Sequence, residues 1–280
     1  MFLFCSGNTH IMQAPNRQQR LAALRDVIAN IERKPALLQA RTPLLSGADG
    51  AFPALPGGLV QEVFTDAGRN GGAGLAFALG QSRALLTPRR PLLLFLQLAE
   101  DAGFFGLPYG PGLAHFGLDP TQIVLVRPKD MKQLLWAAEE ALGCAALGAI
   151  VAEIGAVPAL LDFTASRRLS LRAAETGTSL FLLRYGRARE ASAAHLRWRV
   201  SPQRSARHRH DSGAPGAARW LLLLERGAAL QNQSEWLLEW RENGFATLPP
   251  RLHQPERPGA GAALPCSFSA PLADRLSQTA

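Results

Sequence analysis

The sequence predicts an α/β protein in which a mostly parallel β-sheet is flanked by helices. Between residues 58 and 184, apolar runs of strand length alternate with segments of helical periodicity. Parallel neighbouring strands need a long connection, which the helices supply. After residue 184 only strand-like runs follow, and they predict an antiparallel β extension at the C-terminal side.

These patterns divide the chain into five parts. Residues 17–34 repeat apolar side chains at helical steps and stop at Pro35, which predicts an amphipathic N-terminal helix. The predicted parts are an N-terminal segment over 1–34, a Pro/Gly-rich linker over 35–57, the α/β core over 58–184, a basic β extension over 185–248 and a proline-rich, disordered tail over 249–280.

Within the core, five apolar runs are predicted strands: "LVQEVF", "PLLLFLQL", "QIVLVRP", "GAIVAEIG" and "TSLFLLR". The helices predicted between them cover 74–86, 109–117, 131–147 and 164–175. Asp130 precedes the third helix, where its carboxylate can accept hydrogen bonds from first-turn amides. In the extension, "HLRWRV", "ARWLLLLERG" and "SEWLLEWRENGFATL" are predicted strands, the last turning at Asn243-Gly244.

The composition is typical of a soluble protein with a packed core. Hydrophobic residues make up 47% of the 280, and mean hydropathy is +0.00, as in a soluble protein with a packed core. No stretch approaches the roughly 20 apolar residues of a membrane-spanning helix. Three separated cysteines form neither a disulfide framework nor a zinc motif, which favours a cytoplasmic location. The apolar N-terminus lacks the basic residues of a signal peptide, and we favour Met12 as the initiator.

A glycine-rich turn follows the first core strand and has the position of a phosphate-binding loop. Its glycines are Gly68, Gly71, Gly72 and Gly74. Such a loop needs a lysine to neutralise phosphate and a hydroxyl to hold magnesium, and Gly74 and Leu75 stand at those two places. No lysine occurs between Lys34 and Lys129, and Arg69 is the nearby cation. We therefore interpret the turn as a vestigial nucleotide site without ATPase activity.

Acidic residues follow two of the core strands. In the order of its pieces the core resembles the RecA ATPase core, and this resemblance implies that Glu153 stands at the place of the acid that orders magnesium. It likewise implies that Glu100, with Asp101 beside it, stands at the place of the glutamate that activates water. Without a phosphate loop, we favour carboxylates that bind no metal. No other motif indicates a metal, a catalytic triad or a cofactor, so we predict no metal site, no cofactor and no catalytic residue.

In the order of its pieces, the chain resembles the RecA ATPase core, and more closely the RecA-like ImuA family. The most distinctive segments are "GLDPTQIVLVRPKDMKQLLWAAEEAL", "LDFTASRRLSLRAAE" and "HLRWRVSP", and the resemblance covers roughly residues 17 to 245. It implies a role in the DNA-damage response, in SOS-induced translesion synthesis and mutagenesis. The implied partners are RecA, an ImuB-like polymerase accessory protein and, indirectly, an error-prone polymerase.

Basic residues gather in two places. Nine arginines and only two acidic residues occur between Arg184 and Arg219, and they supply most of the net charge of +8. The candidate partner- or DNA-binding residues are Arg167, Arg168, Arg184, Arg187, Arg189, Arg197, Trp198 and Arg199. Arginine suits phosphate, but an acidic protein surface fits these residues equally well, as does a merely solvated helix face at Arg167 and Arg168.

These observations predict a RecA-like, non-catalytic adaptor that bridges RecA and an ImuB-like protein. A divergent DNA-stimulated ATPase and a SulA-like cell-division inhibitor are the alternatives. Direct DNA contact and homo-oligomerisation are left open by the sequence.

Overall fold

The structure is a computed structural model that describes residues 52–155, 160–206, 208, 210–211, 214–227, 234–242 and 244–249. The predicted N-terminal helix, most of the linker and the tail lie outside these residues. Contacts place the described residues up to Thr247 in one compact unit, while Leu248 and Pro249 belong to a second.

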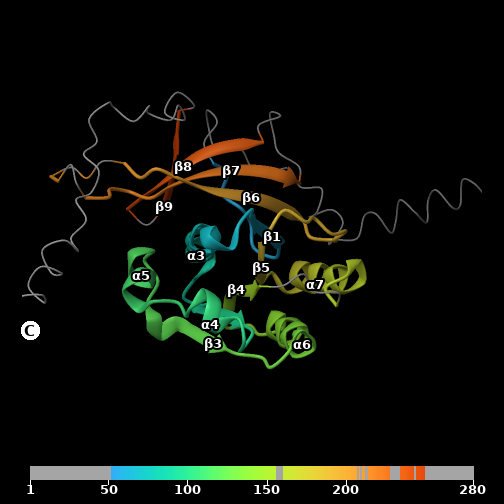
Figure 1. The fold of residues 1–280 in the computed structure, drawn as a ribbon. Helices are drawn as coiled ribbons and strands as arrows, with labels where there is room; N and C mark the ends of the chain where they lie inside the picture. The colour runs from blue at the N-terminus through green and yellow to red at the C-terminus, as the bar shows by residue number, and fades with distance from the viewer. Residues whose placement is uncertain are drawn as a thin grey trace, which may run out of the picture. The chain divides into compact units, whose positions relative to one another are not determined.

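One nine-stranded sheet organises the described residues, and its strand order is β3-β2-β4-β5-β1-β6-β7-β8-β9 (Figure 1). The strands are β1 (Val60–Thr65), β2 (Leu92–Gln97), β3 (Ile123–Val126), β4 (Leu147–Ile154), β5 (Ser179–Tyr185), β6 (Leu196–Gln203), β7 (Arg219–Arg226), β8 (Glu235–Arg241) and β9 (Gly244–Leu248). Strands β3, β2, β4, β5, β1 and β6 pair in parallel, and β7 pairs antiparallel with both β6 and β8.

Helices connect the parallel strands. They are α3 (Gly71–Leu85), α4 (Ala102–Phe105), α5 (Gly110–His115), α6 (Met131–Leu142) and α7 (Phe163–Thr176), with 3-10 turns η2 (Gly68–Asn70) and η3 (Pro120–Gln122). Asp130 accepts a hydrogen bond from the backbone N–H of Gln133, which confirms the predicted cap of α6. The predicted α/β class, with its mostly parallel sheet and antiparallel C-terminal strands, is confirmed.

The structure differs from the sequence-based expectation in the bounds of two helices and in the pairing of one strand. Helix α6 ends at Leu142 rather than at 147, because the chain turns at Gly143 and enters β4 at Leu147. Helix α3 begins at Gly71, so three of the glycines predicted to form a flexible turn, Gly71, Gly72 and Gly74, lie in its first turn, while Gly68 lies in η2. Strand β6 pairs in parallel with β1, so the antiparallel pattern begins one strand later than the sequence predicts.

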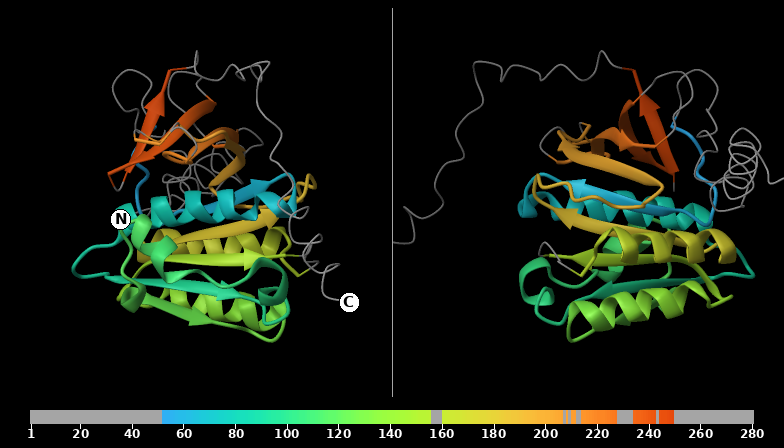
Figure 2. Two further views of the ribbon diagram at one scale, coloured as in Figure 1. Left: turned by 60° about the vertical axis from the view of Figure 1, so that its left-hand side comes forward. Right: turned by 90° about the vertical axis from the view of Figure 1, so that its right-hand side faces the viewer.

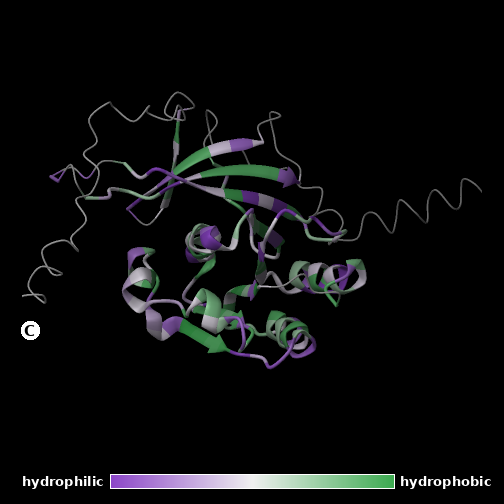
Figure 3. Ribbon diagram, viewed as in Figure 1, coloured by the Kyte–Doolittle hydropathy of each residue, from purple (hydrophilic) through white to green (hydrophobic). Residues whose placement is uncertain are grey.

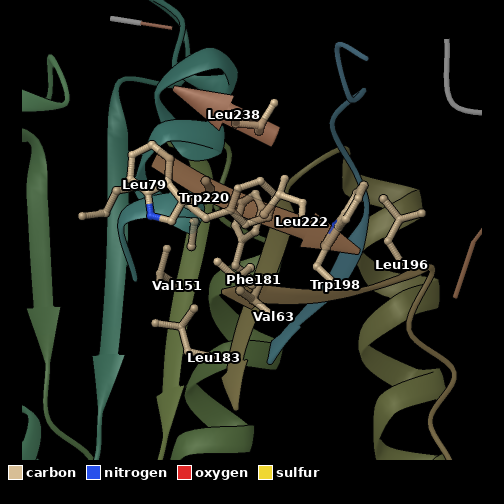
Figure 4. Close-up of a cluster of buried hydrophobic side chains, with 14 of the residues drawn as sticks. Val63, Leu79, Val151, Phe181, Leu183, Leu196, Trp198, Trp220, Leu222 and Leu238 are labelled. Carbon is tan, nitrogen blue, oxygen red and sulfur yellow. The ribbon is translucent and has the colours of Figure 1, made fainter. Parts of the chain in front are cut away.

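Two hydrophobic cores cover the two faces of the sheet. Helices α3 and α5 lie on one side of β1, β4 and β5, and α6 and α7 lie on the other (Figures 1 and 2). On the α3 side, the large rings of Phe77, Trp198, Trp220, Trp236 and Trp240 pack together, in part as Figure 4 shows. The antiparallel strands supply most of these rings and thereby cover α3.

Candidate functional site

The candidate site lies where β1 ends and α3 begins. Residues after Thr65 pass through η2 and enter α3 at Gly71, at the carboxyl ends of the parallel strands. In open α/β sheets, ligands usually bind outside these strand ends. The first backbone N–H groups of a helix also favour an anion. The local backbone therefore has the position that the sequence predicts for a vestigial nucleotide site.

Aromatic side chains fill the space beside this turn. A Cβ added at Gly68 would lie 3.4 Å from the ring of Phe104, and one at Gly71 would lie 3.0 Å from the ring of Tyr185. The ring of Phe105 stacks on Tyr185 with 4.3 Å between centroids. The short helix α4 thus places Phe104 beside Gly68 and Phe105 on the ring of Tyr185.

The other two glycines have different surroundings. Nothing lies within 4 Å of a Cβ built at Gly72, whereas one at Gly74 would lie 3.1 Å from the methyl group of Thr65. Gly74 therefore allows α3 to pack closely on the end of β1. Gly72 has no such packing role, and a side chain fits there.

Glu153 lies next to the turn and is almost completely buried. Its carboxylate accepts a hydrogen bond of 2.6 Å from Nε2 of Gln97 and another from the hydroxyl of Tyr185. Burial raises the pKa of the Glu153 carboxyl, although these two hydrogen bonds act in the opposite direction. Burial next to Glu153 also raises the pKa of the Tyr185 hydroxyl, which keeps it a hydrogen-bond donor.

The neighbouring acids do not form a metal centre with Glu153. Glu100 is exposed, and Asp101 accepts a 3.0 Å hydrogen bond from the backbone N–H of Gly155. Within the described ranges, no group of three or more His, Cys, Asp or Glu side chains is arranged to hold a metal ion. Asp101 thus binds the backbone after β4, and Glu153 holds the side chains of Gln97 and Tyr185.

Four of the candidate basic residues form a charge network on the face of the sheet opposite α3. Glu62 lies 2.8 Å from Arg197 and 4.0 Å from Arg184, and Arg184 also lies 2.9 Å from Glu190. Arg184 is 4% exposed and Glu62 is 2% exposed. These guanidinium groups are therefore neutralised inside the protein.

The same network extends to β7 and the end of β1. Arg189 lies 2.7 Å from Glu225 and 3.3 Å from Asp66, and Arg199 lies 3.8 Å from Glu225. The guanidinium of Arg189 lies 4.0 Å from the ring centroid of Phe64, a cation–π contact. Four arginines thus face four acids, and the network holds the segment between β5 and β6 against the sheet.

The remaining candidates differ in exposure. Trp198 is fully buried, and its indole N–H donates a 2.9 Å hydrogen bond to Gln61. The predicted alternation along β6 is present, since the ring of Trp198 is buried while Arg197 and Arg199 point to the other face. Arg167 and Arg187 are exposed, and Arg168 is exposed but lies 2.9 Å from Glu139 of α6. Among the candidate residues, those on α7 and in the turn after β5 thus present the accessible positive charge.

The sequence-based reasoning missed Gln97, Phe104, Phe105 and Tyr185. These four residues surround Glu153 and the glycine-rich segment, but they come from β2, α4 and β5. A weak signal was available in "DAGFFGLPYG", where two aromatic residues stand between glycines after a strand end. Nothing in the local pattern says which strand end those rings will cover.

Comparisons with known proteins identify relatives by sequence. The chain is 32% identical over 230 residues to Protein ImuA of Caulobacter vibrioides strain NA1000 / CB15N, which covers 75% of this chain and 89% of that protein. Protein ImuA of strain ATCC 19089 of the same species gives the same identity and coverage. No protein-family model matches the chain. None of the helices in the described ranges has the length and apolar character needed to cross a membrane.

Proposed function

The chain belongs to the ImuA family, and on this premise we propose that it is a non-catalytic accessory protein of SOS-induced, error-prone translesion DNA synthesis. It bridges RecA and an ImuB-like polymerase accessory protein through a RecA-like core and acts in the cytoplasm. Family membership is the observation that carries this proposal. The parallel strands, with a glycine-rich helix start after β1 and an acid near the end of β4, support the RecA-like assignment.

The contents of the candidate site support the absence of catalysis. Phosphoryl transfer needs positive charge around the phosphates and an ordered magnesium ion. The ring of Tyr185 lies against Gly71 at the start of α3, and Phe105 stacks on that ring. The carboxylate of Glu153 is occupied by hydrogen bonds from Gln97 and Tyr185. Aromatic packing and hydrogen bonds thus occupy the groups that an ATPase would present to its nucleotide.

A turnover assay with the full chain tests this part of the proposal. We expect no ATP hydrolysis above the blank, with or without single-stranded DNA. The matched variants are Gly72→Asp and Gly72→Ala, because the space at this α-carbon accepts either side chain without disturbing the core. Turnover that Gly72→Asp removes and Gly72→Ala retains would establish a working ATPase instead.

The accessible arginines support a docking role for α7. Arg167 and Arg168 stand on its exposed side, and Arg168 stays 61% exposed although it lies 2.9 Å from Glu139. Arg184 and Arg197 are instead enclosed in ion pairs. An adaptor needs accessible charge. The attraction that guides a partner to its docking surface, and the orientation in which it binds, both depend on charged groups that the partner can reach. Among the candidate residues, we therefore propose Arg167 and Arg168 as the docking contacts, with Arg187 as a further exposed cation.

Co-purification with RecA and with an ImuB-like protein tests the adaptor role. The full chain should retain both of them, and Arg167→Glu with Arg168→Glu should weaken at least one of the two complexes. Arg89→Glu is the control, since Arg89 is an exposed arginine in the turn between α3 and β2. If the full chain fails to capture one or both of the partners, the bridging proposal fails. If the control weakens binding as much as the double variant, the docking surface is not on α7.

A further inference from the structure

The antiparallel strands β7 and β8 are apolar on both faces of the sheet. Trp220 and Leu222 of β7 belong to the hydrophobic core on the α3 side. Because successive side chains of a strand alternate between faces, Leu221 and Leu223 lie on the opposite face. Leu237 of β8 lies there too, since it pairs directly with Leu221. Figure 3 shows β7 as a hydrophobic strand with a hydrophilic end. We call the three residues Leu221, Leu223 and Leu237 the outer leucine patch.

The outer leucine patch has a charged rim. Arg219 and Glu239 form an ion pair of 2.7 Å at one end of β7, and Glu225 lies 2.7 Å from Arg189 at the other end. The face that an antiparallel sheet turns to water is usually polar along its whole length. An apolar centre inside a charged rim is instead the composition of a surface that another element covers.

None of the described helices covers this patch. Figures 1 and 2 show α6 and α7 on this side of the sheet over the parallel strands, and no described helix over β7 and β8 there. The three leucines also belong to neither hydrophobic core of the described residues. Leu237 is nevertheless only 6% exposed, which favours a covering element from outside the described ranges.

Residues 17–34 have the complementary property. Their sequence predicts an amphipathic helix with an apolar stripe made of Leu21, Leu24, Ile28 and Ile31. Most of the stability of such a helix in a protein comes from the packing of its apolar face rather than from the helix itself. The stripe therefore needs a surface on which to pack.

The described part of the chain begins beside the outer strands. The backbone N–H of Phe52 donates a 2.7 Å hydrogen bond to Oγ1 of Thr247 in β9, and the ring of Phe52 lies 5.7 Å from that of Trp236 in β8. The 17 residues of 35–51 join Phe52 to the predicted helix and span at most about 60 Å when extended. Adjacent strands lie about 4.8 Å apart, so the outer leucine patch is well within this reach.

We propose that residues 17–34 form an amphipathic helix that docks, within the same chain, on the outer leucine patch of β7 and β8. Each apolar face of a sheet needs a covering layer, and α6 and α7 supply that layer only over the parallel strands. The N-terminal helix continues the same layer over the antiparallel strands. Its apolar stripe is then packed against its own sheet and is not available to a protein partner.

Amide hydrogen exchange of the full chain, followed by mass spectrometry, tests the docking. Peptides from residues 17–34 should be protected in the wild type, and Leu221→Lys should lower their protection at least about tenfold, because it places a charge at the centre of the patch. Leu171→Lys is the matched control, since Leu171 is 45% exposed on α7. Peptides from β4 report whether each variant keeps its fold. Unprotected residues 17–34 in the wild type would overturn the proposal, as would equal losses in the two variants.

Substitutions in the N-terminal segment test the stripe without any change to the sheet. Ile28→Lys places a charge in the stripe and should lower the protection of residues 17–34 at least about tenfold. Asn30→Lys introduces the same side chain on the opposite side of the predicted helix and should leave the protection unchanged. Equal effects of these two variants would mean that the stripe is not the packed face, and the proposed docking would be wrong.

Photo-cross-linking identifies what covers the patch. A benzophenone side chain in place of Leu221 should link to residues 17–34 and give a product with the mass of one chain. The same probe in place of Trp136, which is 65% exposed on α6, should give no link to that segment. A link from position 221 to residues 249–280, or a product with the mass of two chains, would identify a different occupant and overturn the proposal. The absence of any link from position 221 would overturn it as well.

Discussion

Single glycines of α3 differ sharply in what surrounds them. A Cβ at Gly80 would lie 2.6 Å from the ring of Phe245 and 2.8 Å from the ring of Trp240. A Cβ at Gly72 meets nothing within 4 Å. We therefore expect a change from glycine to alanine to have opposite effects on stability at these two positions, because the packing around them differs while the helix propensity of alanine is the same.

We expect Gly80→Ala to lower the free energy of unfolding by about 1–3 kcal/mol, because two packed rings must move to admit a methyl group. Gly72→Ala should raise it by about 0.5 kcal/mol, because alanine reduces the freedom of the unfolded chain at a position that tolerates it. Urea denaturation of both variants provides the measurement. Equal destabilisation by the two changes would contradict this account.

Glu153 gives the candidate site a pH dependence. Burial raises its pKa in the folded state above the ordinary value of 4.5, so the folded protein keeps a proton that the unfolded chain releases. Between pH 4.5 and the folded-state pKa, the free energy of unfolding therefore falls as pH rises. Glu153→Gln should remove this decline. Between pH 4 and pH 7, the variant should therefore lose less of its free energy of unfolding than the wild type does.

Local contacts allow that substitution. The amide oxygen of a glutamine at 153 can still accept from Tyr185. Oε1 of Gln97 is buried without a hydrogen-bond partner and can accept from the new amide once the Gln97 amide turns over, which gives up the 2.8 Å hydrogen bond from Gln97 Nε2 to the carbonyl of Gly106. The control is Glu100→Gln in the exposed turn after β2. Denaturation midpoints of the wild type and the two variants, measured from pH 4 to pH 7, test this prediction. A wild type and a Glu153→Gln variant with parallel profiles would contradict the prediction.

The sequence predicts the place of a candidate-site residue only where the neighbouring residues in the chain define that place. The place of Glu153 at a strand end follows from the apolar run that precedes it. The rings of Tyr185 and Phe105 come from segments more than thirty residues away from the glycines or from Glu153, and no local periodicity relates them. The predicted vestigial role of Gly68, Gly71, Gly72, Gly74 and Glu153 remains a prediction that the turnover assay addresses.

Among the structural elements, the segment between β5 and β6 shows how charge counted in a sequence differs from charge at a surface. Arg184, Arg189 and Arg197 were counted as a basic cluster, but their partners Glu62 and Asp66 come from β1 or the turn after it, and Glu225 comes from β7. Alternation along β6 correctly predicted which side chains share a face. The alternation did not predict that acidic side chains from β1 and β7 would form ion pairs with these arginines.

We expect Glu62→Gln to lower the free energy of unfolding by about 3–5 kcal/mol, because it leaves two enclosed guanidinium groups without their shared carboxylate. Arg199→Gln should cost less than about 1 kcal/mol, since the Arg199 side chain is 43% exposed and lies 3.8 Å from Glu225. Thermal or urea unfolding of the two variants gives the comparison. If Glu62→Gln is no more destabilising than Arg199→Gln, the network does not anchor this segment.

At the scale of the whole molecule, the sequence predicted the strands and their general direction but not their order. Periodicity reports whether a strand is covered on one face or two, and the runs at β2, β4 and β5 carry that signal. Placement of β1 between β5 and β6 depends on crossover connections and on pairing between distant segments. The parallel pairing of β6 with β1 was therefore missed, although the strand itself was predicted.

The shared core on the α3 side leads to a prediction about cooperativity. Four of the five tryptophans, at positions 198, 220, 236 and 240, are buried in the strands β6, β7 and β8, while the remaining one, Trp136, is 65% exposed on α6. Tryptophan fluorescence therefore reports mainly on the antiparallel side of the sheet. Far-UV circular dichroism near 222 nm reports mainly on the helices that connect the parallel strands.

Both probes should give one coincident urea transition. Trp198 packs 5.7 Å from Phe77 of α3, and the indole N–H of Trp240 donates to the carbonyl of His115 at the end of α5, so the antiparallel strands cannot separate without disrupting the core of the parallel ones. Trp136→Phe should leave the fluorescence transition in place, because the buried rings carry its signal. Fluorescence and circular dichroism midpoints that differ beyond error would instead mean that β6–β9 unfold as an independent unit, and the continuous sheet would then not act as one cooperative structure.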